Sequence, residues 1–334
     1  MEDKQSIRLT SAEVAHLWNT YMSDSMAICV LSYFLIHIQD TDIKPIIEKS
    51  LNLSKKHVND IQQLFKKEGY TIPQGFTERD LNMNAPALFY DTFYVHYLKQ
   101  MSRIGISAYG LGLSIAARED IRKFYESTLF ESIALDNDVT SVLLNKGLYI
   151  RAPFINAPEK IEFVDNNNFL GGLIGHQRPL LGMEIAHLYG NMETASMGKA
   201  LCIAFSQVSK TNEVTKLLLK LRDKAGKQIE SLGSKLEEGH LKVPMTWNDT
   251  VTDSTVAPFS DKLMLFHINA VMATAVADYG ISLAASARKD LSLMYTVLIT
   301  GLGGQIEEGA KIMIQNGWLE KPPSATDRDA LASK

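Results

Sequence analysis

The chain has 334 residues, of which 46% are hydrophobic and 22% are charged, so two folded domains with separate cores are expected. Lysine and arginine together number 34 against 38 acidic residues, which gives a formal net charge of −4. This balance lacks the basic excess of nucleic-acid-binding proteins and argues against that class.

Three features bear on the compartment. Residues 1–5 lack the charged segment and apolar core that open a secretory signal. The longest apolar run, residues 26–38, is too short to span a bilayer. The two cysteines, Cys29 and Cys202, lie in apolar helical runs and are expected to be buried, reduced thiols. These features predict a cytoplasmic protein without a membrane segment.

Apolar residues recur at helical spacing over long stretches in both halves of the chain. Gly, Pro and capping residues mark the ends of these stretches, with Asp120 as the expected N-cap of the fourth. The predicted helices are residues 11–39, 42–68, 87–117, 120–147, 181–209, 213–238, 259–287 and 290–316.

Two segments are much longer than ordinary turns between helices, which have about 2–8 residues. They are residues 70–86 and 241–258, and each follows the second helix of its half. At ~3.3 Å per residue, such a segment can run the length of a helix. We therefore expect a long crossover between the second and third helices of each half, as in ferritin-like bundles.

The two halves of the chain share two strings of residues. Residues 13–18 recur as residues 184–189, in the pattern Glu-x-Ala-His-Leu-aromatic. Residues 109–125 recur as residues 279–295, with seven of the seventeen positions identical. The sequence thus predicts an all-α chain of two tandem four-helix bundles. The expected domains are residues 1–150, a connector at 151–179, residues 180–321 and a flexible tail at 322–334.

The best candidates for chemistry are the paired Glu13 and His16 and their repeat, Glu184 and His187. Residues three apart lie on one face of a helix, and this spacing supplies ligands in di-iron bundles. A capping box formed with Thr10 is an alternative role for Glu13. Leu181, at the corresponding place before Glu184, cannot cap in this way, so capping alone does not explain both pairs.

The number of ligands argues against a di-iron centre, which needs about six ligands and a second Glu-x-x-His motif. Only one such motif is shared by the two halves. On the fourth helix, Glu131 aligns with Gly301, and on the second helix His57 aligns with Gln228. Neither Glu131 nor His57 is therefore repeated.

A structural network is the leading interpretation of the repeated polar residues. In a crossover bundle, the first and fourth helices run parallel and start at the same end. Glu13 and His16 would then lie near Arg118, Asp120 and Tyr125. The second copy would bring together the equivalent residues, namely Glu184, His187, Arg288, Asp290 and Tyr295. Such a network of carboxylates and cationic donors fixes the register of a bundle.

The Glu-x-x-His-Leu-aromatic opening and the Tyr-Gly … Arg-x-Asp … Tyr string resemble domain-of-unknown-function family 3231 of Bacillus-like spore formers. The resemblance covers nearly the whole chain as two tandem copies. It implies a ferritin-like fold related to that of a class of spore coat proteins and an origin in a sporulating Gram-positive bacterium. It implies no reaction, and the missing second Glu-x-x-His motif puts iron oxidation in doubt.

The sequence therefore favours a non-enzymatic structural or stress- and spore-associated protein without a cofactor. The first alternative is a metal-binding protein or di-iron oxidoreductase that uses iron or another divalent metal at Glu13, His16, Glu184 and His187. The second is a binding module for a small apolar ligand beside the glycine-rich residues 105–112. Expected partners are other proteins or further copies of the chain, with no nucleic acid and no membrane.

Overall fold

The computed structural model describes residues 7–173, 175 and 177–333. Within this part of the chain, regular structure is helical and β pairing is confined to isolated bridges, so the predicted all-α class is confirmed. The long helices are α1 (Ser11–His37), α2 (Lys44–Glu68), α3 (Asp91–Ile115), α4 (Glu119–Asn145), α5 (Gly182–Val208), α6 (Asn212–Glu237), α7 (Asp261–Ala285) and α8 (Lys289–Gln315). We call α1–α4 the first unit and α5–α8 the second unit.

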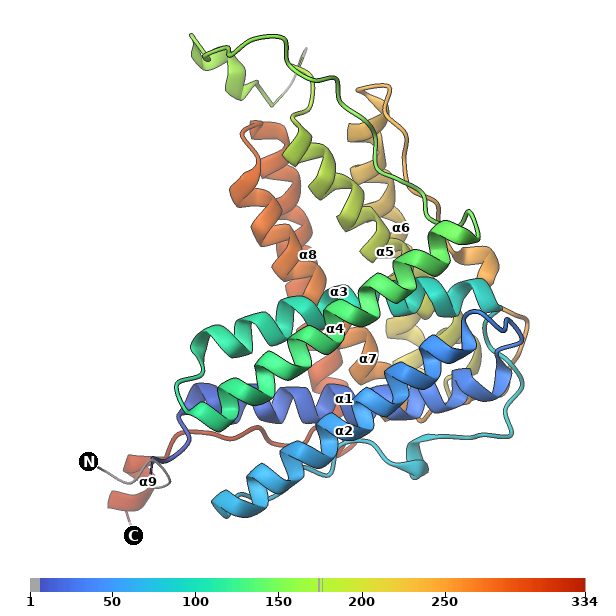
Figure 1. Cartoon of the computed structure of the whole chain (residues 1–334), viewed down its shortest axis with the longest axis vertical. Coiled ribbons are helices and arrows are strands. Elements are labelled where there is room, and N and C mark those ends of the chain that lie inside the picture. Colours follow the sequence, from blue (N-terminus) through green and yellow to red (C-terminus); the bar gives the residue numbers. More distant parts are fainter. Residues whose placement is uncertain (1–6, 174, 176, 334) are drawn as a thin grey trace.

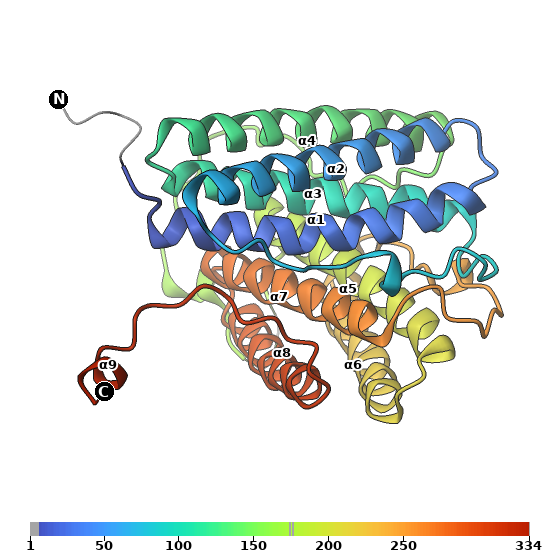
Figure 2. The same ribbon diagram turned by 90° about the horizontal axis from the view of Figure 1, so that it is seen from below.

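Each unit packs its four helices together. In the first unit, α1 and α4 each contact both α2 and α3. In the second unit, α5 and α8 each contact both α6 and α7. The helices of the second unit cross the direction of those in the first (Figure 1), and α7 runs alongside the first unit (Figure 2).

Long segments join the second helix to the third in both units. Residues 69–90 contain the short helix η1 (Glu78–Asp80), and residues 238–260 contain η3 (Asn248–Thr250). Gly69 ends α2 in the left-handed region, with φ of 69°, which glycine adopts without steric cost. The chain then leaves the helix axis and returns along the bundle to the start of α3.

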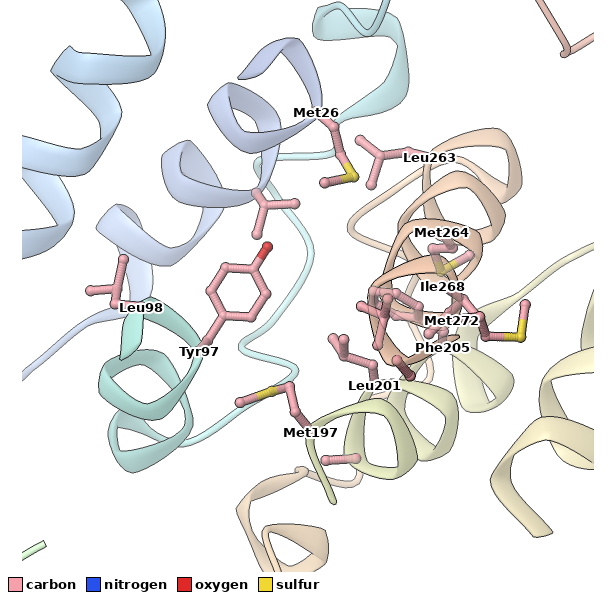
Figure 3. Close-up of a cluster of buried hydrophobic side chains, with 14 of the residues drawn as sticks. Met26, Tyr97, Leu98, Met197, Leu201, Phe205, Leu263, Met264, Ile268 and Met272 are labelled. Carbon is pink, nitrogen blue, oxygen red and sulfur yellow. The ribbon is translucent and has the colours of Figure 1, made fainter. Parts of the chain in front are cut away.

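An apolar cluster fills the junction between the two units. Met26 of α1 and Tyr97 of α3 face residues of α5 and α7 (Figure 3). Within the described residues, α7 is the one helix long and apolar enough to cross a membrane by length and composition. Here α7 packs on α5 and α8 and runs alongside the first unit.

Two local predictions need correction. The third helix begins at Asp91 instead of residue 87, because residues 87–90 are not helical and the N–H of Tyr90 donates to Thr250 O (2.9 Å). The N-cap of α4 is Arg118, whereas Asp120 lies in the first turn and pairs with that arginine. The segment predicted to be a flexible tail contains the short, exposed helix α9 (Arg328–Ala332), and its flexibility stays a prediction.

The glycine-rich end of α3 packs tightly against α4. A Cβ at Gly112 would lie 2.8 Å from a ring carbon of Tyr125, whereas a Cβ at Gly110 would meet nothing within 4 Å. Gly112 is therefore needed for the approach of the two helices, and Gly110 is not.

We predict that Gly112→Ala lowers the free energy of unfolding by about 1–3 kcal/mol, because the Tyr125 ring must move. Gly110→Ala is the control, and we expect it to raise stability by about 0.5–1 kcal/mol through better helix propensity. Urea unfolding followed by circular dichroism measures both. Equal effects of the two substitutions would contradict this packing.

Candidate functional site

Glu13 lies in the first turn of α1 with 1% of its surface exposed. One carboxylate oxygen accepts bonds from the N–H (2.8 Å) and hydroxyl (2.9 Å) of Thr10. The other accepts the N–H groups of Ala117 (3.0 Å) and Arg118 (2.8 Å). A carboxylate has about four lone-pair positions, so Glu13 is saturated. Burial favours a higher pKa for Glu13, but these hydrogen bonds outweigh it and lower the pKa.

Glu184 in α5 is fully buried and also accepts four hydrogen bonds. The Arg178 guanidinium donates to both oxygens, each at 2.8 Å. The N–H groups of Leu181 (2.8 Å) and Arg288 (3.3 Å) supply the remaining two bonds. Arg178 thus supplies two bonds in this unit. Both glutamates tie the first helix of a unit to the turn before its fourth helix.

Two arginine–aspartate pairs lie at these turns. Arg118 binds Asp120 through Nε (2.7 Å) and Nη2 (2.9 Å), and its Nη1 lies 2.8 Å from Glu68 at the end of α2. Arg288 binds Asp290 in the same way, at 3.0 and 2.8 Å. The structure therefore brings together the glutamate, arginine and aspartate of each predicted network.

The tyrosines and histidines of the predicted networks lie apart from these bonds. Tyr125 and Tyr295 are buried, and their hydroxyls are not among the groups bound by the glutamate or aspartate of their networks. Burial raises the pKa of Tyr295 to about 12. His16 and His187 are half-buried, and neither ring is among the four donors bound by the glutamate of its pair.

The donors around the two Glu-x-x-His pairs do not suit a metal ion. Glu13 has no lone pair left for a metal, and Glu184 is already neutralised by Arg178. Across the described residues, no group of three or more His, Cys, Asp or Glu side chains is placed to hold a metal. Metal binding at Glu13, His16, Glu184 and His187 therefore stays a prediction without geometric support.

A buried polar cluster that the sequence analysis set aside lies inside the first unit. His57 of α2 is 3% exposed and lies between two carboxylates. Its Nδ1 is 3.1 Å from Asp24 of α1, and its Nε2 is 3.0 Å from Glu131 of α4. The hydroxyls of Ser54 (2.8 Å) and Tyr109 (3.4 Å) donate to Asp24. All four helices of the unit thus contribute to the cluster.

The electrostatics favour a protonated His57. Burial favours a lower pKa, but the hydrogen bonds and charges of Asp24 and Glu131 outweigh it and raise the pKa of His57. Burial likewise favours a higher pKa for Glu131, but Lys56 and His57 outweigh it and lower the pKa. When His57 is protonated, both of its N–H groups donate to carboxylates.

A cavity of about 360 Å³ lies beside this cluster. Asp24, Ser54 and His57 form part of its polar lining, and leucines such as Leu31 and Leu98 form part of its apolar lining. The helix α3 lines it with Gly105, Ala108 and Leu111, within the glycine-rich stretch predicted to accommodate a ligand. His16 also lines the cavity.

The second unit closes one side of the cavity through α7. His267, Val271 and Thr274 of that helix are among the lining residues. Two buried lining atoms, Ser50 Oγ and His267 Nδ1, have no hydrogen-bond partner among the described residues. Leaving a buried polar atom without a partner costs about 1–3 kcal/mol, so these atoms favour occupation of the cavity by a hydrogen-bonding molecule.

The second unit contains a counterpart of only about 40 Å³. Each of its 13 lining residues corresponds to a lining residue of the large cavity, 171 positions earlier for α5 and α6 and 170 earlier for α7 and α8. Most polar lining residues of the first unit are exchanged for apolar or amide side chains. The exchanges include Asp24 to Ala195, Ser50 to Leu221, Ser54 to Ala225, His57 to Gln228, Ser102 to Met272 and Ser132 to Leu302.

The sequence model of a family described as protein of unknown function (DUF3231) matches residues 2–161 and, a second time, residues 168–331. The chain belongs to this family. DUF3231 is thus present as two tandem copies, one for each unit, and residues 162–167 between them fall within the predicted connector 151–179. The limits of the other predicted domains, 1–150, 180–321 and 322–334, stay predictions.

One solved structure similar to this member of DUF3231 is that of a presumed spore coat protein from Bacillus halodurans. It is 17% identical, with a TM-score of 0.42, and the alignment covers 46% of this chain and 100% of that one. A comparison with curated proteins gives no match.

We predict that Glu13→Ala lowers the free energy of unfolding by about 2–4 kcal/mol, because buried donors lose their acceptor. His16→Ala is the matched control on the same helix, and we expect it to change stability by less than about 1 kcal/mol. Urea unfolding measures both, with elemental analysis of each protein alongside. A bound metal that both substitutions remove would overturn the structural role of Glu13.

A second prediction concerns pH. The pKa of His57 is raised above its usual 6.5, so its charge stabilises the fold fully below pH 6.5. This contribution is lost as pH rises through the folded-state pKa. We expect the stability difference between the native protein and His57→Gln, which copies Gln228, to shrink with rising pH. Urea unfolding across a pH series measures it, and a difference independent of pH would contradict the charged state.

Proposed function

We propose that the first unit is a ferritin-like four-helix bundle that binds one small amphipathic molecule in the cavity beside Asp24 and His57. The observation that carries the proposal is the cavity of about 360 Å³, a size typical of small-molecule sites. The counterpart cavity in the second unit is nearly closed. The second unit packs its four helices in the same way without a large cavity, so the fold itself does not require one, and this supports a specific role for the cavity of the first unit.

The charge of the lining favours an uncharged or positively charged head group on the ligand. No lysine or arginine is among the described residues that line the cavity, and its carboxylate belongs to Asp24. His57 is directed toward Asp24 and Glu131, so its charge is already balanced. A buried anionic ligand would meet no lysine or arginine, and burying an unpaired charge is costly.

The arrangement supports binding more than catalysis. A general base must present a free nitrogen or oxygen within about 2.6–3.2 Å of the proton that it removes. Both ring nitrogens of His57 already face carboxylates. Within the described residues, His267 presents a free Nδ1 to the cavity, but burial lowers the pKa of that ring to about 4, which makes it a weak base. We therefore propose a non-enzymatic protein, in which the cluster holds the polar end of a ligand.

A purely structural role is the second candidate, and the two saturated glutamates favour it. Glu13 and Glu184 fasten the ends of both units through eight hydrogen bonds in all, four each. Association with spores, a place in the cytoplasm and protein partners stay predictions. Fractionation of the source cells before and after sporulation tests the first of these.

We predict that hexylamine and hexanol, which share an apolar tail, raise the melting temperature, whereas hexanoate does not. At about ten times its Kd, a ligand adds about 1.4 kcal/mol to stability. Differential scanning fluorimetry measures the shift, and isothermal titration calorimetry measures the stoichiometry. A response to hexanoate equal to that of hexylamine would contradict the proposed charge preference.

Variants that copy the second unit supply the controls. Ser50→Leu reproduces Leu221, fills the cavity and is expected to abolish binding while the fold is kept. Gln228→Leu changes the small cavity and is expected to leave binding intact. Asp24→Asn is expected to weaken hexylamine more than hexanol. Unchanged binding in Ser50→Leu would place the ligand elsewhere.

A further inference from the structure

Many of the contacts between the two units occur in pairs, in which one contact is the image of the other when the units are exchanged. The crossovers, residues 69–90 and 238–260, lie side by side and form antiparallel bridges between Leu81 and Phe259 and between Phe89 and Val251. An offset of 170 residues turns Leu81 into Val251 and Phe89 into Phe259. Each bridge is therefore the image of the other, which means that it joins the equivalent residues with the two units exchanged.

The backbone hydrogen bonds beside these bridges follow the same exchange. Asn82 N donates to Pro258 O (2.7 Å), and its image, Thr252 N, donates to Leu88 O (3.0 Å). Tyr90 N donates to Thr250 O (2.9 Å), and its image, Ser260 N, donates to Asp80 O (3.0 Å). Four backbone bonds thus join the units in two related pairs.

Aromatic contacts across the junction repeat in the same way. Phe76 of the first crossover packs on Phe266 of α7, with ring centroids 4.9 Å apart. Their images are Trp247 of the second crossover, 171 residues after Phe76, and His96 of α3, 170 residues before Phe266. The Trp247 and His96 rings are stacked, with centroids 5.1 Å apart. The chemistry of the pair differs between the copies, but the place of contact does not.

One contact lies at the centre of this arrangement. Tyr97 OH is 3.1 Å from His267 Nε2, and both side chains are buried. Tyr97 and His267 are equivalent positions, 170 residues apart. A residue touches its own equivalent only when it lies at a twofold axis, as in an isologous dimer. Figure 3 shows the Tyr97 hydroxyl directed into this junction.

The covalent link between the units lies away from these contacts. From residue 151 to residue 168, every residue except Pro153 is exposed. Contacts without an image also reach across. Tyr189 OH donates to Ile150 O (2.8 Å) at the start of the connector, and Arg103 Nη2 of α3 donates to Thr194 Oγ1 of α5 (2.6 Å). The paired contacts, in contrast, involve the crossovers, α3 and α7.

We propose that this chain is a covalently joined isologous dimer, whose two units hold together through the crossovers and the α3–α7 junction without the connector. The surface is self-complementary, so its natural partner is another unit of the same fold. In this chain the second unit covers that surface of the first unit, and α7 thereby completes the wall of the cavity.

The test is to introduce a site for a sequence-specific protease between the exposed residues Glu159 and Lys160 and to cut the folded protein. Size-exclusion chromatography with light scattering then reports the mass. We expect the cut fragments to elute together near the 37.2 kDa of the intact chain. Fragments that separate in native buffer, at about half that mass, would overturn the proposal.

Two matched pairs of substitutions locate the contact. Tyr97→Lys with His267→Lys places like charges at the axis, and we expect the cut fragments of this variant to separate. Phe130→Lys with Thr300→Lys changes equivalent exposed positions on α4 and α8, and we expect those fragments to stay together. Tyr189→Phe removes one of the contacts without an image and is also expected to leave them joined. Separation in either control, or association in the axis variant, would contradict the assignment.

Discussion

A carboxylate withdrawn from water has to find a donor for each of its lone pairs, and this requirement organises both units. Glu13 meets it only if the start of α1 and the turn before α4 lie at the same level. Asp24 is 11 residues beyond Glu13 and Glu131 is 13 residues beyond Arg118, so both lie ~16–20 Å along their helices. The saturated glutamate at the end of the bundle thereby brings two acids level in its interior, with His57 between them.

The residues that could be predicted from the sequence are those that both copies need. The Glu, Arg and Asp of each network recur at the same spacing because they position helices, and the structure joins them as the repeat indicated. His57 and Glu131 were set aside because Gln228 and Gly301 stand opposite them. This difference indicated a role specific to the first unit, since a buried charged residue that is not repeated is not needed to build the fold that both copies share. Asp24 and Ser54 also differ from their equivalents in the second unit. The four differences together could have predicted a polar cluster in the first unit alone.

The crossovers show what periodicity could not reveal. Their length fits the need to return along a bundle, but the sequence offered no reason for residues 87–90 to leave the third helix. The reason lies in the other unit, because the Tyr90 N–H finds its acceptor in Thr250, far along the chain. Pairing between segments so distant in sequence depends on how the folded units dock, and no local pattern encodes it. The same holds for Tyr97 and His267, which look like unrelated core residues until the units meet.

Because α7 contributes a wall of the cavity, a molecule bound there as proposed would contact both units. Such a molecule would bind the docked arrangement more tightly than separated units and would therefore stabilise the docking. By thermodynamic reciprocity, separation of the units would weaken the binding of that molecule by the same factor. Affinity for the proposed ligand and association of the two units would then be two measures of one coupling free energy.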